Sequence, residues 1–186
     1  MINEFKGRMK SEFDMTDLGK MKYFLGVEVI QNSSGIFITQ RKYAKEILKK
    51  FGMESSNPTK TPMVPRFKLI KDEGGTQIYS TQYKKIIGSL MYLTVSRPDL
   101  MYVMSLVSRY MERATTLHMT VVKRILRYLK GTTELGICYN RENGDNELIA
   151  YSDSDYAGDL DDRRSTSGYV FAMSSGQWHG VRKNRQ

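Results

Sequence analysis

The spacing of apolar residues predicts two helices and a hairpin in the first fifty residues. Residues 2–13 carry apolar side chains at helical spacing, namely Ile2, Phe5, Met9 and Phe13. Residues 21–30 are rich in β-branched and aromatic side chains and predict a strand, with which residues 36–38 pair after an Asn-Ser-Ser-Gly turn. A second amphipathic helix is expected over residues 40–51, and Gly52 suits its C-terminal cap.

The pattern that follows predicts an irregular segment, three helices and three strands. Residues 53–80 are rich in Pro, Gly, Ser and Thr and should form an extended linker. Helices are expected over residues 83–95, 98–111 and 117–130. Strands are expected over about residues 135–140, 147–152 and 168–173. The fold class is therefore expected to be α+β, with a helical middle.

The chain of 186 residues is strongly basic, with 29 Lys and Arg against 20 Asp and Glu and a net charge of +9. An excess of this size favours a polyanionic partner through counterion release. No apolar run reaches transmembrane length and no basic amphipathic stretch carries an aromatic belt, so a membrane partner is not expected. The N-terminus has no apolar signal core, and the single cysteine, Cys138, excludes an internal disulfide. We therefore expect an intracellular protein in a reducing compartment.

A carboxylate motif lies in the segment YSDSDYAGDLDDRRSTSGYVF, residues 151–171. A short apolar run that ends at Tyr151 leads directly into Asp153 and Asp155. A carboxylate at the end of a buried strand can hold a divalent metal, and Mg²⁺ prefers hard oxygen ligands of this kind. The alternative is that both aspartates solvate a β-turn, where Asp is a common residue.

This segment closely resembles the opening of the ribonuclease H domain in copia-type LTR-retrotransposon polyproteins, with its pattern S-D-x-D-[WY]-A-G-D…R-R-S-T-S-G-[YF]. The resemblance implies that Asp153 is the first catalytic aspartate and a metal ligand, with Asp155 the less favoured choice. The cofactor of the family is Mg²⁺, held by further acidic residues. Because Asp159, Asp161 and Asp162 do not match those later positions, we expect an incomplete site that holds no metal stably.

The resemblance extends over almost the whole chain. MTDLGKMKYFLGVEV is similar to the end of the reverse-transcriptase palm, in which the F-L-G hairpin holds the primer strand near its 3′ end. By position, that role falls to Phe24, Leu25 and Gly26. The plain alternative is a hairpin with a glycine bulge.

The later strings resemble the passage from palm to thumb and the helical thumb itself. They are GIFITQRKYAKEILKKFGM, NPTKTPM, YKKIIGSLMYLTVSRPDLMYVMSLVSRYM and KRILRYLKGT, in the order of the family. The implied domains are residues 1–39 for the end of the palm, 40–131 for the thumb with its linker at about 53–80, and 132–186 for the first part of ribonuclease H.

Two of the expected helices carry basic side chains on one side. On the helix over residues 40–51 these side chains are Lys42, Lys45 and Lys49, and on the helix over residues 117–130 they are Lys123, Arg124, Arg127 and Lys130. Such rows indicate phosphate contacts that do not read sequence, and they are equally typical of a solvated helix face.

The two histidines and the single tryptophan carry weaker signals. His118 and His179 have no Cys or His at metal-ligand spacing, so each is expected to lie at a surface or an interface. Trp178 falls near the tryptophan that follows the second ribonuclease H strand in the family, although WHGVRKNRQ departs from the pattern W-x-S-K-x-Q.

The function expected from the resemblance is that of a part of a polyprotein that synthesises DNA on RNA and cleaves RNA–DNA hybrids. The palm motif Tyr-x-Asp-Asp, which holds metals for nucleotide transfer, does not occur in the sequence, so we expect the chain alone to be catalytically inactive. The expected partner is an RNA–DNA hybrid or duplex template–primer, bound without regard to sequence, or the intact polyprotein. No small-molecule substrate is indicated. A degenerate piece without a role, a nucleic-acid-binding module and a protein-interaction module all fit the sequence.

Overall fold

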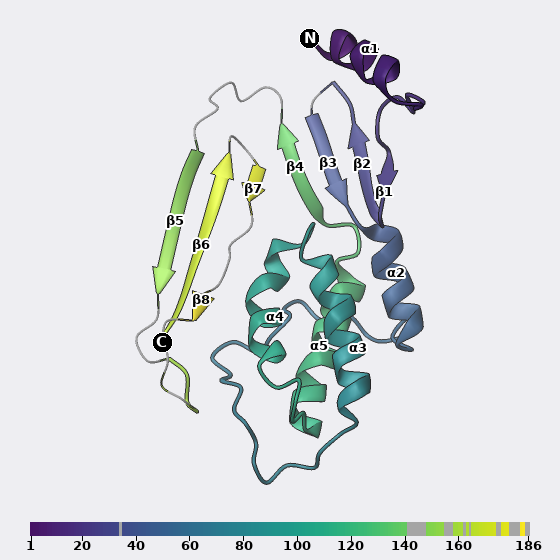
Figure 1. The fold of residues 1–186 in the computed structure, drawn as a ribbon. Helices are drawn as coiled ribbons and strands as arrows, with labels where there is room; N and C mark the ends of the chain where they lie inside the picture. Colours follow the sequence, from purple (N-terminus) through teal and green to yellow (C-terminus); the bar gives the residue numbers. More distant parts are fainter. Residues whose placement is uncertain are drawn as a thin grey trace.

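Two antiparallel sheets accompany a body of helices in the computed structural model, as Figure 1 shows. The structure describes residues 1–33, 35–140, 148–154, 158–161, 163, 165–173, 176–178 and 183–184. The fold class is α+β, with the helices in the middle of the chain, as expected. Among the described residues, no helix combines the length and hydrophobicity needed to cross a membrane.

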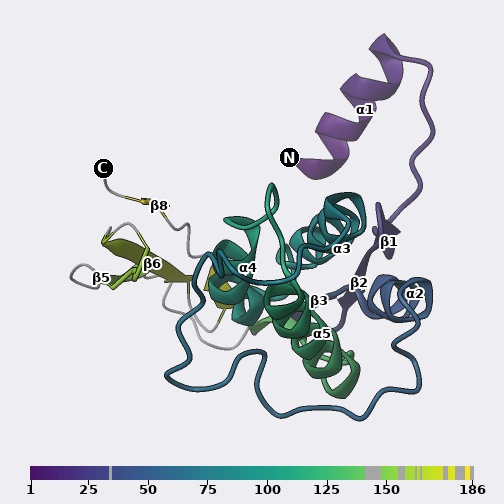
Figure 2. The same cartoon turned by 90° about the horizontal axis from the view of Figure 1, so that it is seen from below.

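The first helix, α1 (Ile2–Glu12), forms where the apolar spacing predicted it but buries none of its side chains. Ile2 and Phe5 are 69% and 63% exposed, so the apolar stripe of the helix lies in solvent. In Figure 2 an extended segment separates α1 from the sheet that follows.

The first sheet has the strand order β1-β2-β3-β4, built from β1 (Tyr23–Phe24), β2 (Val27–Gln31), β3 (Gly35–Thr39) and β4 (Gly136–Asn140). The prediction of one strand over residues 21–30 was wrong, because the chain reverses at Leu25 and Gly26. Both have positive φ, 46° and 80°, as the two central residues of a type I′ turn require. Phe24 therefore pairs with Val27, across a two-residue hairpin.

Strand β4 belongs to this first sheet, although the sequence grouped it with the C-terminal segment. It pairs with β3 from Gly136, opposite Thr39, to Asn140, opposite Gly35. Ile137, only 6% exposed, lies opposite Ile38 in this pairing. The chain thus leaves the sheet after β3, forms the helical body and returns to the same sheet.

The helical body consists of α2 (Arg41–Lys50), α3 (Ser80–Leu93), the 3₁₀ turn η1 (Pro98–Leu100), α4 (Met101–Ser108) and α5 (Thr116–Gly131). All of the predicted helices are confirmed, with ends that differ by a few residues. Their apolar positions form one core, whose least exposed members include Tyr83, Ile87, Leu90, Leu100, Val107, Ile125 and Leu129. Gly52 ends α2 as predicted, with φ +66° and a hydrogen bond of 2.7 Å from the Met53 amide to the Leu48 carbonyl.

The predicted linker contains neither helix nor strand between residues 51 and 79, yet it is not a free connector. Leu69 is 6% exposed and belongs to the helical core, and Met53, Met63 and Ile78 pack against that core. In Figure 2 the segment runs around the outside of α5, on the side away from α3.

The second sheet has the order β5-β6-β7, from β5 (Leu148–Ser154), β6 (Thr166–Met173) and β7 (Gly176–Trp178), and β8 (Lys183–Asn184) also pairs with β6. The turn between β5 and β6 is attached to the helical body. Asp159 forms an ion pair with Arg109 at the end of α4. Asp161 accepts hydrogen bonds from the Lys71 amide, at 3.2 Å, and the Tyr110 hydroxyl, at 3.1 Å.

Candidate nucleic-acid interface

The hairpin turn between β1 and β2 presents its apolar side chains to solvent. Tyr23, Phe24 and Leu25 are 51%, 60% and 70% exposed. Gly26 is required by the positive φ of its position, since a left-handed backbone strains residues with a Cβ. An exposed, tightly turned backbone is a surface against which another extended backbone can lie.

Two tyrosines of the helical body hold this turn in place. The Tyr92 hydroxyl, on α3, donates a hydrogen bond to the Leu25 carbonyl. A Cβ on Gly26 would lie 3.5 Å from the Tyr92 ring, so this ring packs directly on the turn. Tyr43 of α2 meets Tyr92 edge to face at a centroid distance of 5.1 Å and donates to the Ser89 carbonyl at 3.3 Å. The position of the turn is therefore fixed relative to both α2 and α3.

The lysines of α2 differ in how free they are to meet a ligand. The Lys42 Nζ lies 5.3 Å from the centroid of the Tyr23 ring, which places a cation beside the hairpin turn. Lys45 lies 3.8 Å from a carboxylate oxygen of Glu134. Lys49 is exposed, and the ion pairs among the described residues include neither Lys42 nor Lys49. Lys42 and Lys49 are the α2 side chains best placed for phosphate.

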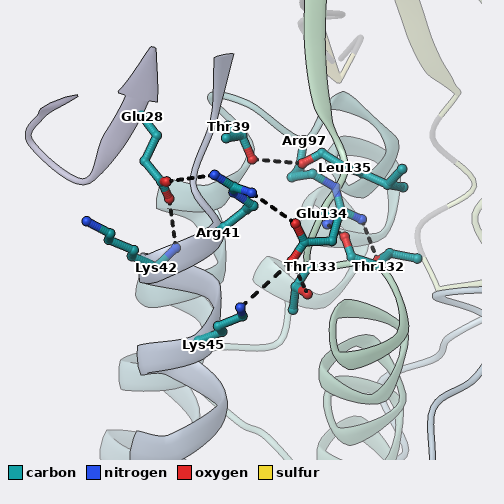
Figure 3. A network of polar contacts seen from close by, with 10 residues as sticks. All are labelled: Glu28, Thr39, Arg41, Lys42, Lys45, Arg97, Thr132, Thr133, Glu134 and Leu135. Atoms are coloured by element: carbon teal, nitrogen blue, oxygen red, sulfur yellow. Dashed lines mark hydrogen bonds and ion pairs between the residues drawn. The ribbon is translucent and has the colours of Figure 1, made fainter. Parts of the chain in front are cut away.

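A polar network fixes the first turn of α2 between β2 and the residues that precede β4 (Figure 3). The carboxylate of Glu28, on β2, accepts a 2.9 Å hydrogen bond from the Lys42 amide and lies 3.4 Å from the Arg41 guanidinium. A carboxylate at this position satisfies a free N–H and complements the helix dipole. Arg41 also reaches Glu134, next to β4, at 3.2 Å. Arg41 is thus committed to the protein's own carboxylates.

The predicted basic row on α5 is divided by the structure. Lys123 and Lys130 are exposed, as a phosphate contact requires. Arg124 and Arg127 are half-buried: Arg124 donates to the Thr61 hydroxyl at 2.9 Å, and the Arg127 Nε donates to the Asn57 carbonyl at 2.7 Å. The two arginines therefore bond to the segment that follows α2, which charge patterning alone could not reveal.

The acidic candidates do not assemble into a metal site within the described part of the chain. Asp153 lies on β5 opposite Gly168, but its side chain, like Asp155 and Asp162, lies outside the described residues. Asp159 and Asp161 bond to the helical body instead. No group of three or more His, Cys, Asp or Glu among the described residues could hold a metal ion. The described residues thus do not form a Mg²⁺ centre.

The prediction that His118 lies at a surface or interface was wrong, because its side chain is fully buried. Thr115 and His118 form a capping box at the start of α5, in which the Thr115 amide donates to His118 Nδ1 at 3.0 Å. The ring stacks on Tyr110 at a centroid distance of 4.2 Å, and its Nε2 lies 2.9 Å from the Ile70 carbonyl. The spacing Thr-x-x-His before an apolar run was the available signal, with His in place of the usual Glu or Gln.

The other weak candidates are not informative. His179 and the side chain of Trp178 lie outside the described residues. Cys138 is exposed on β4.

Stability should decrease as the pH falls below the ordinary histidine range. Nδ1 accepts from the Thr115 amide, so the ring is neutral with its proton on Nε2. Burial lowers the pKa of His118 further than the Ile70 carbonyl, Asp72 and Asp161 together raise it. Because the folded pKa lies below the unfolded value of about 6.5, the unfolded chain takes up the proton first as the pH falls. Urea unfolding at about pH 7.5 and about pH 5.5 measures the loss. His118→Gln keeps a capping-box acceptor and should remove that part of the pH dependence; an unchanged dependence would contradict the assignment.

Comparison with known proteins relates the chain to retrotransposon polyproteins. Residues 1–65 match the family described as Reverse transcriptase (RNA-dependent DNA polymerase). The Retrovirus-related Pol polyprotein from transposon TNT 1-94 of Nicotiana tabacum is 36% identical over 185 residues, and that from transposon RE1 of Arabidopsis thaliana is 40% identical over 170 residues. These alignments cover 95% and 91% of this chain, which spans only 14% and 12% of the two relatives.

A shorter relative is matched over most of its length. The Uncharacterized mitochondrial protein AtMg00810 of Arabidopsis thaliana is 36% identical over 171 residues, which cover 91% of this chain and 70% of the relative. No solved structure matches the chain. The family match and these long alignments show that the chain belongs to the family of copia-type retrotransposon Pol polyproteins, and resembles a part that includes reverse-transcriptase sequence.

Proposed function

We propose that this chain binds an RNA–DNA hybrid or duplex template–primer without reading its sequence, as the primer-contacting part of a reverse transcriptase. The observation that carries the proposal is the exposed turn at Leu25 and Gly26, fixed by Tyr92 beside the cation of Lys42. Backbone and lysine groups that meet phosphates set position without reading bases. Within this proposal, the first sheet is the end of the palm and the helical body is the thumb.

The surface proposed for the nucleic acid has two parts. The first comprises the hairpin turn, Phe24 to Gly26, with Lys42, Lys45 and Lys49 of α2. The second is the basic row of α5, with Lys123, Arg124, Arg127 and Lys130. A charge of +9 on the whole chain supports such a partner through counterion release.

Duplex binding should weaken steeply with salt, and the α2 lysines should account for part of the slope. Replacing both Lys42 and Lys49 by Gln removes two phosphate contacts, so the slope of log K against log salt on duplex DNA should fall by about 1.8, or about 0.9 for each contact. Fluorescence anisotropy with a short labelled duplex measures the slope, and affinity should fall alike for unrelated sequences. The binding uses no metal, so EDTA should leave it unchanged.

The matched control is Arg8→Gln with Lys10→Gln, which removes two positive charges from α1, outside the proposed surface. This control should leave the slope nearly unchanged. Equal losses from both pairs would mean that net charge acts at a distance and that α2 makes no contact. Absence of binding at about 50 mM salt would refute the proposed function.

The second sheet we propose to be the opening of a ribonuclease H-like sheet, with Asp153 on its first strand. Its support is the antiparallel order β5-β6-β7 and the acidic residue at the end of β5. We expect the chain alone to be catalytically inactive, with neither primer extension on an RNA template nor cleavage of a labelled RNA–DNA hybrid in Mg²⁺ or Mn²⁺. Turnover that survives repurification and is lost in Asp153→Asn would contradict the expected inactivity and assign cleavage to this sheet.

A further inference from the structure

The strongest unexplained feature is the contact between α5 and the segment Asn57–Thr61, which we name the strap. Besides its bonds to Arg124 and Arg127, the strap donates a backbone hydrogen bond of 3.3 Å from the Thr59 amide to the Arg127 carbonyl. Pro58 packs on Gly131, where a Cβ would lie 3.0 Å from the proline's own Cβ. The strap therefore lies directly on the last turns of α5.

The strap gives the two arginines neutral partners only. Their acceptors are the Asn57 carbonyl and the Thr61 hydroxyl, and no ion pair among the described residues includes either arginine. The Nε of Arg124 is buried and has no hydrogen-bond partner within the described part of the chain. A buried N–H without an acceptor is costly, so the strap satisfies Arg124 incompletely.

A phosphate group is a better acceptor for these guanidinium groups than the strap. The bonds to the strap already have a charged donor, but a phosphate adds a charged acceptor, and Arg meets phosphate with two parallel N–H groups. Lys123 and Lys130 are already exposed on the same helix, so a phosphate backbone arriving there would reach the arginines next.

The strap can separate from α5 without unfolding the helical core. It has no helix or strand, and Pro58 donates no backbone hydrogen bond. Met53 before it and Met63 after it pack against the helical core, so they hold both ends while the middle moves. Figure 2 shows the segment that contains the strap passing along the outer side of α5, away from α3.

We propose that the strap is a displaceable cover over a phosphate-binding surface, and that a nucleic-acid duplex binds α5 by displacing it from Arg124 and Arg127. This inference rests on the proposed nucleic-acid-binding function and adds its regulation: the cost of displacing the strap lowers the affinity of α5 for any polyanion. Changes that lift the strap should therefore strengthen binding.

The first test is hydrogen exchange of the whole chain, free and saturated with a short duplex DNA. The Thr59 amide should exchange faster in the complex, because its bond to the Arg127 carbonyl is lost. Unchanged or increased protection of residues 57–61 on binding would overturn the proposal.

The second test is Gly131→Ala, whose new methyl group would lie 3.0 Å from the Pro58 Cβ, so that the strap must shift slightly and its bonds to α5 should weaken. Affinity for duplex DNA should rise by on the order of tenfold, the equivalent of about one net hydrogen bond. Adding Arg124→Gln and Arg127→Gln to this variant should abolish the gain. Gly7→Ala is the control, since a Cβ there meets nothing within 4 Å.

The outcomes separate this inference from the proposed function. If residues 57–61 exchange faster in free Gly131→Ala but affinity is unchanged, the strap does not regulate binding. If exchange of residues 57–61 is unchanged in free Gly131→Ala, the variant has not moved the strap. The inference is then decided by comparing the exchange of these residues in free and duplex-bound wild type. Suppose that the double variant Lys42→Gln and Lys49→Gln shows the expected decrease in the salt slope of duplex binding while the strap tests fail. The proposed function then stands and only the strap inference is refuted. If neither wild type nor Gly131→Ala binds duplex, both fail.

Discussion

Replacing Arg97 by Met should lower the free energy of unfolding by about 3 kcal/mol, at the lower end of the range for breaking a buried ion pair. The Arg97 side chain is 3% exposed and lies 2.7 Å from the carboxylate of Asp99, whose side chain is 34% exposed. It also donates to the carbonyl and the hydroxyl of Thr132, at 2.7 and 2.8 Å, and so joins η1 to the end of α5. Methionine fills the space but removes these charged donors, which leaves the Asp99 carboxylate with the Tyr128 hydroxyl and the Thr132 carbonyl with the Leu135 amide.

The matched control is Arg8→Met, which removes an exposed ion pair on α1. In this pair an Arg8 guanidinium nitrogen lies 3.0 Å from a Glu4 carboxylate oxygen. This loss should be within about 0.5 kcal/mol, since pairs between exposed residues contribute little. Burial alone would raise the pKa of Asp99, but Arg97 and Tyr128 outweigh it and hold that pKa below its usual range. Urea unfolding near neutral pH measures both variants, and equal losses would mean that Arg97 is not the junction that its contacts indicate.

The helices could be predicted from the sequence because their signal is local. Tyr83, Ile87 and Leu90 recur at the spacing of one helix face, and that face forms the core. Gly52 as a cap was readable for the same reason, since a helix end needs a residue that accepts positive φ. Short-range periodicity and caps therefore sufficed for the helical body.

The strand partners could not be predicted, because pairing is a long-range property. Strand β4 is separated from β3 by the whole helical body, and only the register of Ile137 opposite Ile38 reveals their sheet. The apolar pattern missed the turn at Leu25 for a different reason, although the family resemblance expected a hairpin at Phe24, Leu25 and Gly26. Leucine is uncommon at positive φ, so the run of apolar residues gave no sign of a chain reversal. An Asn-Gly pair at these positions would have predicted a two-residue hairpin turn.

The candidate site was predictable in residue type but not in accessibility. The sequence shows that Lys42 and Arg127 are cations on helix faces, and it cannot show that one meets solvent while the other bonds to Asn57. His118 illustrates the same limit, since the Thr-x-x-His spacing allows a capping box but cannot show that the ring is buried and stacked on Tyr110. Which acceptors face a side chain is decided by the fold.

Replacing Gly136 by Ala should cost about 3 kcal/mol, the upper part of the range for overpacking. The new Cβ would overlap the backbone oxygen of Ile38 and lie 3.0 Å from both the Phe37 ring and the Thr39 Cβ. A backbone oxygen within a sheet cannot move aside as the end of a side chain can, so β4 would have to separate from β3.

Gly168→Ala on β6 is the matched control, because it adds the same methyl group to another strand where no atom lies within 4 Å. Its effect on unfolding should stay within about 0.5 kcal/mol. Hydrogen exchange should also increase along β3 in Gly136→Ala, since these amides lose their partners on β4, while the amides of α5 keep theirs. If Gly136→Ala is as harmless as Gly168→Ala, then β4 does not pair with β3 and belongs with the C-terminal segment instead.

A large loss of stability, with faster exchange confined to β3, would place β4 in the first sheet. The helical body would then be an insertion between two strands of one sheet. The hairpin, the helices and β4 would form one cooperative unit.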